Sequence, residues 1–200
     1  MTVTTAQGQY TADHLVITAG PWAAEVLASL DLPLTVLRQV VYWFEPQSHP
    51  EYFRPDRLPI YLFAAEENLP LIYGFPSIPG REGVKVALHG TPVVCTPATV
   101  DRTIHADEEL NMRHRLATTL PLLNGRLLRA ETCLYTMTPD EHFIVDRHPH
   151  HAQVSIAAGF SGHGFKFANV MGEILANMAT ARPPAFDLGL FSLSRFRQPA

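Results

Sequence analysis

The sequence predicts a mixed fold, in which an α/β domain is interrupted by a domain built on a largely antiparallel sheet. The first observation is a short apolar run ending in glycine near each end of the chain, "HLVITAG" at 14–20 and "QVSIAAG" at 153–159. Such runs are typical of strands buried on both faces, and a helical pattern follows each of them. The second observation is that residues from about 35 to 146 change to a succession of strand patterns. A nucleotide-binding domain interrupted by a substrate domain accounts for both observations.

Composition limits the classes of protein that remain. The chain has 200 residues, 46% of them hydrophobic, and a net charge of −4. This length suits one domain or one and a half, and the mild acidity argues against a nucleic-acid partner. No apolar run approaches the roughly 18 residues of a membrane helix, and the start lacks the regions of a signal peptide. We therefore expect a cytoplasmic protein without a membrane partner.

The first elements follow from short local patterns. Residues 2–12 alternate on either side of a glycine and predict a hairpin. After the strand at 14–20, Pro21 opens a predicted helix over 21–30. The helical spacing predicts an apolar face on this helix, made of Trp22, Val26, Leu27 and Leu30.

The middle of the chain predicts strands interrupted by one helix. The helix covers 106–120 and carries acidic residues in its first turn, as the helix dipole prefers. The predicted strands are 35–45, 59–65, 70–75, 83–90, 127–137 and 142–147.

The stretch "GFSGHGFKFANVMGEILANMA", 159–179, joins the last strand to the last long helix. From Phe167 onward Phe167, Met171, Ile174, Leu175 and Met178 follow helical spacing. The glycines do not have the order of the dinucleotide-binding G-x-G-x-x-G fingerprint. They do not form the nucleophile elbow G-x-S-x-G either, because His163 stands where that motif needs a second glycine.

Two lysines are candidates for chemistry. Lys166 lies in the predicted first turn of the last helix, where an ammonium and free N–H groups together favour an anion; a solvated lysine is the alternative. On strand 83–90, Val84, Val86 and Leu88 share one face and leave Lys85 and His89 on the other, about 13 Å apart. These two residues either line one extended ligand or belong to an ordinary half-exposed strand.

Other reactive residues favour structural interpretations. Cys95 and Cys133 are the only cysteines, which excludes a disulfide framework or a CxxC metal site. A lone cysteine among apolar residues, such as Cys133, is usually an inert core residue. The histidines of "HPHH" at 148–151 predict a polar loop rather than a metal site, and the adjacent Asp140 and Glu141 cannot form a catalytic pair on a strand.

Several motifs occur in the order found in monomeric sarcosine oxidases and N-methyl-L-tryptophan oxidases. They are "RQVVYWFEP" (38–46), "YGFPS" (73–77), "VKVALHG" (84–90), "CLYTMTPDEHFIVD" (133–146) and "AAGFSGHGFKF" (157–167). Over nearly its whole length the chain resembles the C-terminal half of this family of FAD-dependent amine oxidoreductases. The ending "FDLGLFSLSRFR" (186–197) is most similar to the N-methyltryptophan oxidase branch.

The resemblance implies oxidative demethylation of an N-methyl amino acid by FAD and O₂, giving formaldehyde, amine and hydrogen peroxide. It implies that Lys85 activates oxygen as a charge beside a developing anion. It further implies that Tyr73 and His89 line the substrate cavity, and that Lys166 binds the substrate carboxylate beside the backbone of Gly162. The implied flavin contacts are a thioether to Cys133 and the loop residues Gly159, Phe160, Gly162, His163, Gly164, Phe165 and Lys166.

The resemblance also implies a domain organisation. Residues 1–32 and 151–182 are the remainder of a Rossmann-like FAD-binding domain, 33–150 a β-rich substrate-binding domain, and 183–200 a C-terminal tail. The family's N-terminal ADP-binding half, with its G-x-G-x-x-G loop, is missing, and the segment between Tyr73 and Lys85 is one residue longer. Two alternatives stay open. One is an amine or amino acid dehydrogenase of the same fold; the other is a non-catalytic remnant or split subunit that needs an N-terminal partner chain.

Overall fold

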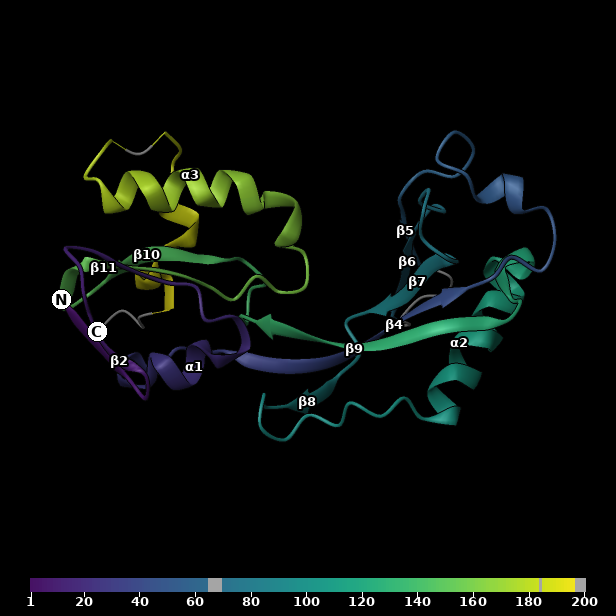
Figure 1. Ribbon diagram of the computed structural model, residues 1–200, viewed down its shortest axis with the longest axis horizontal. Coiled ribbons are helices and arrows are strands. Elements are labelled where there is room, and N and C mark those ends of the chain that lie inside the picture. The colour runs from purple at the N-terminus through teal and green to yellow at the C-terminus, as the bar shows by residue number, and fades with distance from the viewer. Residues whose placement is uncertain (65–69, 184, 197–200) are drawn as a thin grey trace. The chain divides into compact units, whose positions relative to one another are not determined.

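The chain folds into two compact units, which are traced in Figure 1. The structure is a computed structural model and describes residues 1–64, 70–183 and 185–196. The first unit contains 1–36 and 135–200, and the second contains 37–134. The sequence places the boundaries at 32/33 and 150/151 instead. The C-terminal boundary differs because β10 (Ile144–His148) pairs with β11 (His151–Ala158) and therefore belongs to the first unit.

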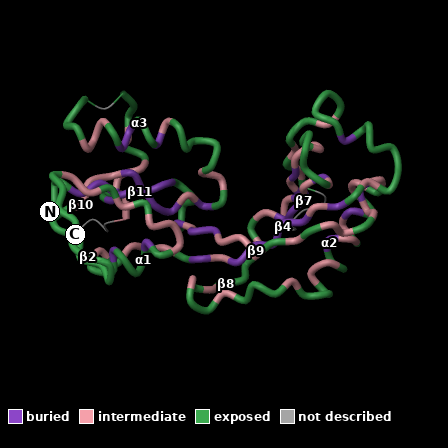
Figure 2. The backbone as a smooth tube through the Cα atoms, viewed as in Figure 1, coloured by how far each residue is buried: buried purple, intermediate pink, exposed green. Residues whose placement is uncertain are grey.

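The first unit is a three-stranded sheet between two apolar layers (Figure 1). Its strand order is β10-β11-β3, in which β3 (Leu15–Ile17) runs parallel to β11 and β10 runs antiparallel to it. Successive residues of β10 point to opposite layers: Val145 packs against helix α3 (Ala168–Ala179), whereas Ile144 packs against Ala23 and Leu27. The second part of β11, 154–158, is buried, as its sequence predicts, whereas 151–153 are exposed (Figure 2).

Two expectations for the start of the chain are confirmed, and two are wrong. The hairpin forms as β1 (Thr2–Thr5) and β2 (Gly8–Thr11), and a strand forms at 15–17. That strand is only half-buried, because it lies at the edge of the described sheet. The predicted helix is divided into η1 (Gly20–Trp22), α1 (Ala23–Val26) and η2 (Ala28–Leu30). This break removes the 3.6-residue period, so Trp22 and Val26 are 49% and 57% exposed.

The second unit is built on a mostly antiparallel sheet. Its strand order is β5-β6-β7-β4-β8, with β9 (Leu127–Met137) also paired to β4 (Thr35–Phe44). The other strands are β5 (Tyr61–Phe63), β6 (Leu71–Phe75), β7 (Val84–His89) and β8 (Val93–Cys95). The sequence did not predict β8, and Ala65, at the end of predicted strand 59–65, lies outside the described residues.

One face of this sheet forms the core of the second unit. Helix α2 (Ala106–Thr119) contributes the fully buried Met112 and Leu116 to a cluster with Val84, Val86 and Leu88. This confirms the apolar face predicted for strand 83–90. Short 3₁₀ turns complete the chain: η3 (Pro50–Phe53), η4 (Pro121–Leu123), η5 (Phe165–Phe167), η6 (Gly189–Phe191) and η7 (Leu193–Phe196).

None of the helices in the described ranges is long and apolar enough to cross a membrane. The cytoplasmic location expected from the sequence stays a prediction.

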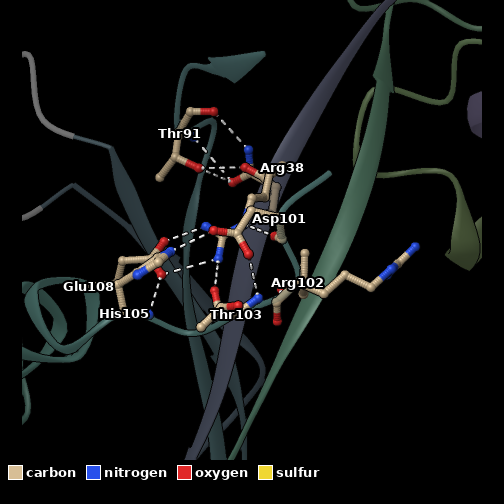
Figure 3. Close-up of polar contacts among 9 residues, drawn as sticks. Arg38, Thr91, Asp101, Arg102, Thr103, His105 and Glu108 are labelled. Atoms are coloured by element: carbon tan, nitrogen blue, oxygen red, sulfur yellow. Dashed lines mark hydrogen bonds and ion pairs between the residues drawn. The ribbon is translucent and has the colours of Figure 1, made fainter. Parts of the chain in front are cut away.

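Arg38 connects β4 to helix α2 and to the segment before it (Figure 3). Its side chain is 5% exposed; it donates to the carbonyls of Asp101 at 2.5 Å and Thr103 at 2.6 Å and forms an ion pair with Glu108. Glu108 also accepts a hydrogen bond from the N–H of His105 at 2.9 Å, which caps the helix. Burial alone would raise the pKa of the Glu108 carboxyl, but the hydrogen bonds from Arg38 and His105 outweigh burial and lower it.

We expect Arg38→Met to lower the free energy of unfolding by about 3 kcal/mol, because it leaves a partly buried carboxylate without its partner. Arg126→Met is the matched control: the Arg126–Glu45 pair is exposed, with side-chain exposures of 73% and 53%, and its loss should cost less than about 0.5 kcal/mol. Urea unfolding of the three proteins measures both values. Equal effects of the two substitutions would contradict the role given to Arg38.

Candidate functional site

The face of the second unit's sheet that lies opposite its core carries the candidate residues. Residues directly opposite each other on antiparallel strands project to the same face. On β7, Lys85 lies between Trp43 of β4 and Phe75 of β6, and Tyr73 of β6 lies opposite Ala87. His89 comes two residues after Ala87 on β7 and therefore shares this face.

Lys85 is surrounded by aromatic rings. Its Nζ lies 5.2 Å from the ring centre of Phe75, 5.6 Å from that of Trp43 and 6.0 Å from that of Tyr73. Within the described ranges Lys85 forms no ion pair with a carboxylate. The ring of Tyr73 also meets the ring of His89 edge-on at 6.2 Å. Lys85, Tyr73 and His89 therefore form one continuous patch on the sheet.

Cys133 of β9 belongs to the same face. Arg129, four residues earlier on β9, lies 4.2 Å over the ring of Trp43, and the alternation of a strand places Cys133 on the side of Arg129. Cys133 is a free, half-buried thiol. Burial raises its pKa, and the positive charge of Lys85 opposes part of this increase. Cys133 therefore lies near enough to Lys85 for the ammonium to influence its thiol.

The glycine loop of the first unit has an unusual backbone. Gly159, Ser161 and Gly162 all have positive φ, at 64°, 47° and 77°. A Cβ on Gly162 would lie 2.3 Å from the ring of Tyr135, and a Cβ on Gly164 would lie 2.5 Å from Phe160. Glycine is therefore required at 162 both by its φ and by the packing of Tyr135.

Ser161 holds this loop in place. It is 1% exposed despite its left-handed backbone, and its hydroxyl donates to the carbonyl of Gly159 at 3.1 Å. The same oxygen accepts the N–H of Thr138 at 3.3 Å, which ties the loop to the residue after β9. In the described part of the chain the N–H groups of Gly162 and Gly164 donate to no acceptor.

Lys166 and Phe165 project from this loop. Lys166 is exposed, and the residue lies in η5, one turn before α3 rather than in the first turn of that helix. Its Nζ lies 5.2 Å from the ring centre of Phe167. Phe165 is 95% exposed, whereas His163 packs 4.8 Å from the ring of Phe143. The loop therefore presents an ammonium and two free N–H groups, which together suit an anion.

The remaining reactive groups have structural partners. Asp140 accepts hydrogen bonds from Arg195 at 2.7 and 3.2 Å, and the carbonyl of Glu141 meets the ring of His163 at 3.1 Å. The rings of His148, at the end of β10, and His151, at the start of β11, lie 4.7 Å apart, so that only 149–150 form the turn where the sequence predicts a loop over 148–151. No group of three or more metal-ligating side chains occurs among the described residues.

A cavity of about 340 Å³ lies beside α3, and Asp146 and Arg147 are among the residues that line it. Asp146 in its wall accepts hydrogen bonds from the hydroxyl of Ser192 and the N–H of Leu193, both at 2.8 Å. Arg147 donates to the carbonyls of Ala152 at 2.7 Å and Met178 at 2.8 Å. Asp146 and Arg147 are therefore occupied in holding the C-terminal segment and the end of α3.

Sequence reasoning missed the residues that surround the candidates. Trp43 and Phe75 were not singled out, since only the pairing register shows that they flank Lys85. The packing of Tyr135 against Gly162 was not expected either, because it joins distant segments. One signal in the sequence was available: the chain contains thirteen arginines but only two lysines, Lys85 and Lys166. Where an ion pair is sufficient, this chain uses arginine.

Comparison with known proteins shows the family to which the chain is similar. The sequence profile of the family described as "FAD dependent oxidoreductase" matches residues 1–178. The monomeric sarcosine oxidase of Streptomyces avermitilis is 48% identical over 195 residues, which is 96% of this chain and 50% of that protein. The N-methyl-L-tryptophan oxidase of Yersinia pestis is 36% identical over 197 residues, or 98% of this chain and 51% of that protein. Identity therefore does not favour the N-methyltryptophan branch suggested by the ending of the chain.

Solved structures show the same fold. The amino acid oxidase NikD superposes with a TM-score of 0.77 at 22% identity, covering 96% of this chain and 50% of that one. The glycine oxidase of Geobacillus kaustophilus gives 0.75 at 23% identity, covering 98% and 49%. The chain spans about half the length of the curated relatives it matches.

The Asp140–Arg195 pair predicts a pH dependence of stability. The hydrogen bonds from Arg195 hold the pKa of Asp140 at about 2, below its unfolded value near 3.9. The pair therefore stabilises the fold above about pH 4, and this contribution disappears as the pH falls toward 2. We expect the stability difference between the native chain and Asp140→Asn to shrink over this range in urea unfolding. Asp56→Asn, which breaks an exposed pair with Arg54, is the control; a constant difference for Asp140→Asn would contradict the assignment.

Lys85 should control the reactivity of Cys133. Lys85→Met removes the charge that lowers the pKa of the Cys133 thiol, so that pKa should rise further. Lys85→Arg keeps the charge and should leave the pKa near its native value. The pH dependence of iodoacetamide alkylation, measured in a Cys95→Ser background, reports the shift. An unchanged profile in Lys85→Met would show that the two side chains do not interact.

Proposed function

Because the chain belongs to the family of FAD-dependent oxidoreductases, we propose that it forms the substrate-facing half of an N-methyl amino acid oxidase. The substrate is of the sarcosine or N-methyl-L-tryptophan type, as in the named relatives. In the overall reaction the N-methyl amino acid, O₂ and water give the amino acid, formaldehyde and hydrogen peroxide. The observation that carries the proposal is the patch of Lys85, Tyr73, His89 and Cys133 on one face of the sheet.

The residues present fit the ring end of FAD. In the second unit, Cys133 offers a half-buried thiol for a thioether. In the first unit, taken by itself, the N–H groups of Gly162 and Gly164 have no acceptor among the described residues and suit the acceptor atoms of a flavin ring. No G-x-G-x-x-G loop occurs in the 200 residues, so the chain has no counterpart of the usual pyrophosphate site. FAD, when bound, supplies the acceptor for the hydride equivalent that leaves the N-methyl group.

The chain's own residues have separable roles in this proposal. Lys85 is a fixed positive charge that stabilises negative charge developing during oxidation, and this effect is strongest where water is excluded. The exposed Lys166 and the free N–H groups of its loop bind the substrate carboxylate. In the second unit, Tyr73 and His89, in edge-on contact, line the substrate cavity. The lysine at 85 favours the oxidase over a dehydrogenase of the same fold.

We expect the 200-residue chain alone to retain FAD weakly and to produce no peroxide. Fusion of the N-terminal half of the Streptomyces avermitilis relative to this chain should restore a yellow protein that forms peroxide from sarcosine or N-methyl-L-tryptophan. The visible spectrum and a peroxide assay measure both outcomes. A folded, flavin-loaded fusion that oxidises neither substrate would contradict the proposal.

Three variants of the fusion test the individual roles. Lys85→Met should slow reoxidation by O₂ more than reduction by substrate, whereas Lys166→Met should mainly raise the KM. In Cys133→Ser the colour should leave the protein on acid precipitation, while in the parent fusion it stays in the pellet. Each variant serves as a control for the other two, because it changes one of the three residues and leaves the others intact.

A further inference from the structure

Lys85 differs from several arginines of this chain in what surrounds it. Arg38, Arg113 and Arg195 each form an ion pair with a carboxylate, at Glu108, Glu109 and Asp140. Arg129, over the ring of Trp43, is paired with Glu131 at 2.8 Å. Lys85 has no carboxylate partner within the described residues, and three aromatic rings lie within 6.0 Å of its Nζ.

The rings reach Lys85 from both sides of its strand. Trp43 of β4 and Phe75 of β6 are its two direct cross-strand neighbours, and Tyr73 is the diagonal neighbour on β6. All four side chains are half-buried, so water is only partly displaced from the ammonium. Three rings from two strands, all on one face, form a box around the end of one side chain.

We propose that Trp43, Tyr73 and Phe75 are positioning residues that hold the Lys85 ammonium by cation–π attraction in place of an ion pair. The face of an aromatic ring attracts a cation through its quadrupole but carries no net charge. A carboxylate would fix Lys85 equally well and would cancel its charge. The aromatic box fixes the ammonium and leaves its full charge available to an anion at the sheet surface. The role of the Lys85 charge toward an anion rests on the proposed function, whereas the cation–π contacts of the box do not.

The two-lysine composition allows a direct test on the chain itself. Lysine labelled with ¹³C at the ε-carbon gives one signal from Lys85 and one from Lys166, and Lys85→Arg assigns them. In the native chain we expect the Lys85 ε-protons to be shifted upfield by ring currents and restricted in motion. Lys166, exposed beside a single ring, is the internal reference.

Substitutions separate the box from a general structural effect. Trp43→Leu and Phe75→Leu should each move the Lys85 signal toward that of free lysine, whereas Trp43→Phe and Tyr73→Phe, which keep a ring, should retain most of the shift. A circular-dichroism spectrum and a urea midpoint close to those of the native chain show that the fold is intact. A native Lys85 signal already at the free-lysine position, or one that Phe75→Leu leaves unmoved, overturns the proposal.

This readout requires neither flavin nor turnover, so it separates the two proposals. If Lys85 is held by the rings but the fusion oxidises no N-methyl amino acid, the proposed function is wrong and the aromatic box is still supported. If Lys85 is mobile but the fusion is active, the aromatic box is wrong and the proposed function is still supported.

Discussion

The alternation of side chains along β7 is the constraint on which the second unit depends. Val84, Val86 and Leu88 must all point into the core against helix α2, so Lys85 and His89 necessarily share the opposite face. A shift of register by one residue would bury the ammonium and expose three apolar side chains, and the core therefore fixes the orientation of the site. The same packing that stabilises the sheet thus decides which residues can meet a ligand.

The chain uses its two kinds of cation for different purposes. Arginine is found where two segments must be joined, as between Arg38 and the start of α2 or between Arg195 and Asp140. Its planar group makes several hydrogen bonds in fixed directions, which suits such connections. The two lysines instead occupy positions without a carboxylate partner in the described ranges, Lys85 among aromatic rings and Lys166 on an exposed loop. A compact ammonium left without a counter-ion retains its charge for an anionic ligand.

The glycine loop combines local and tertiary requirements. Its positive φ angles at 159 and 162 are a local property that glycine tolerates. The close approach of Tyr135 to Gly162 is tertiary, because the tyrosine comes from the end of β9, more than twenty residues earlier. The hydroxyl of Ser161 connects the loop to the residue after β9, because its oxygen accepts a hydrogen bond from the N–H of Thr138. Local backbone and tertiary packing together therefore fix the shape of this loop.

The amino-acid sequence by itself determined most of the strands, helices α2 and α3, the apolar face of β7 and the candidate lysines, because period-two and helical patterns are local. The sequence also contained the motifs of the flavin-dependent family in their usual order. Helical and strand periodicity alone could not have indicated that family. Only the tertiary structure decided that Trp22 and Val26 are exposed, that β3 is an edge strand and that β8 exists. It also decided that Trp43 and Phe75 flank Lys85. The physical reason is that cross-strand neighbours are set by pairing register between segments far apart in the chain, which no local pattern encodes.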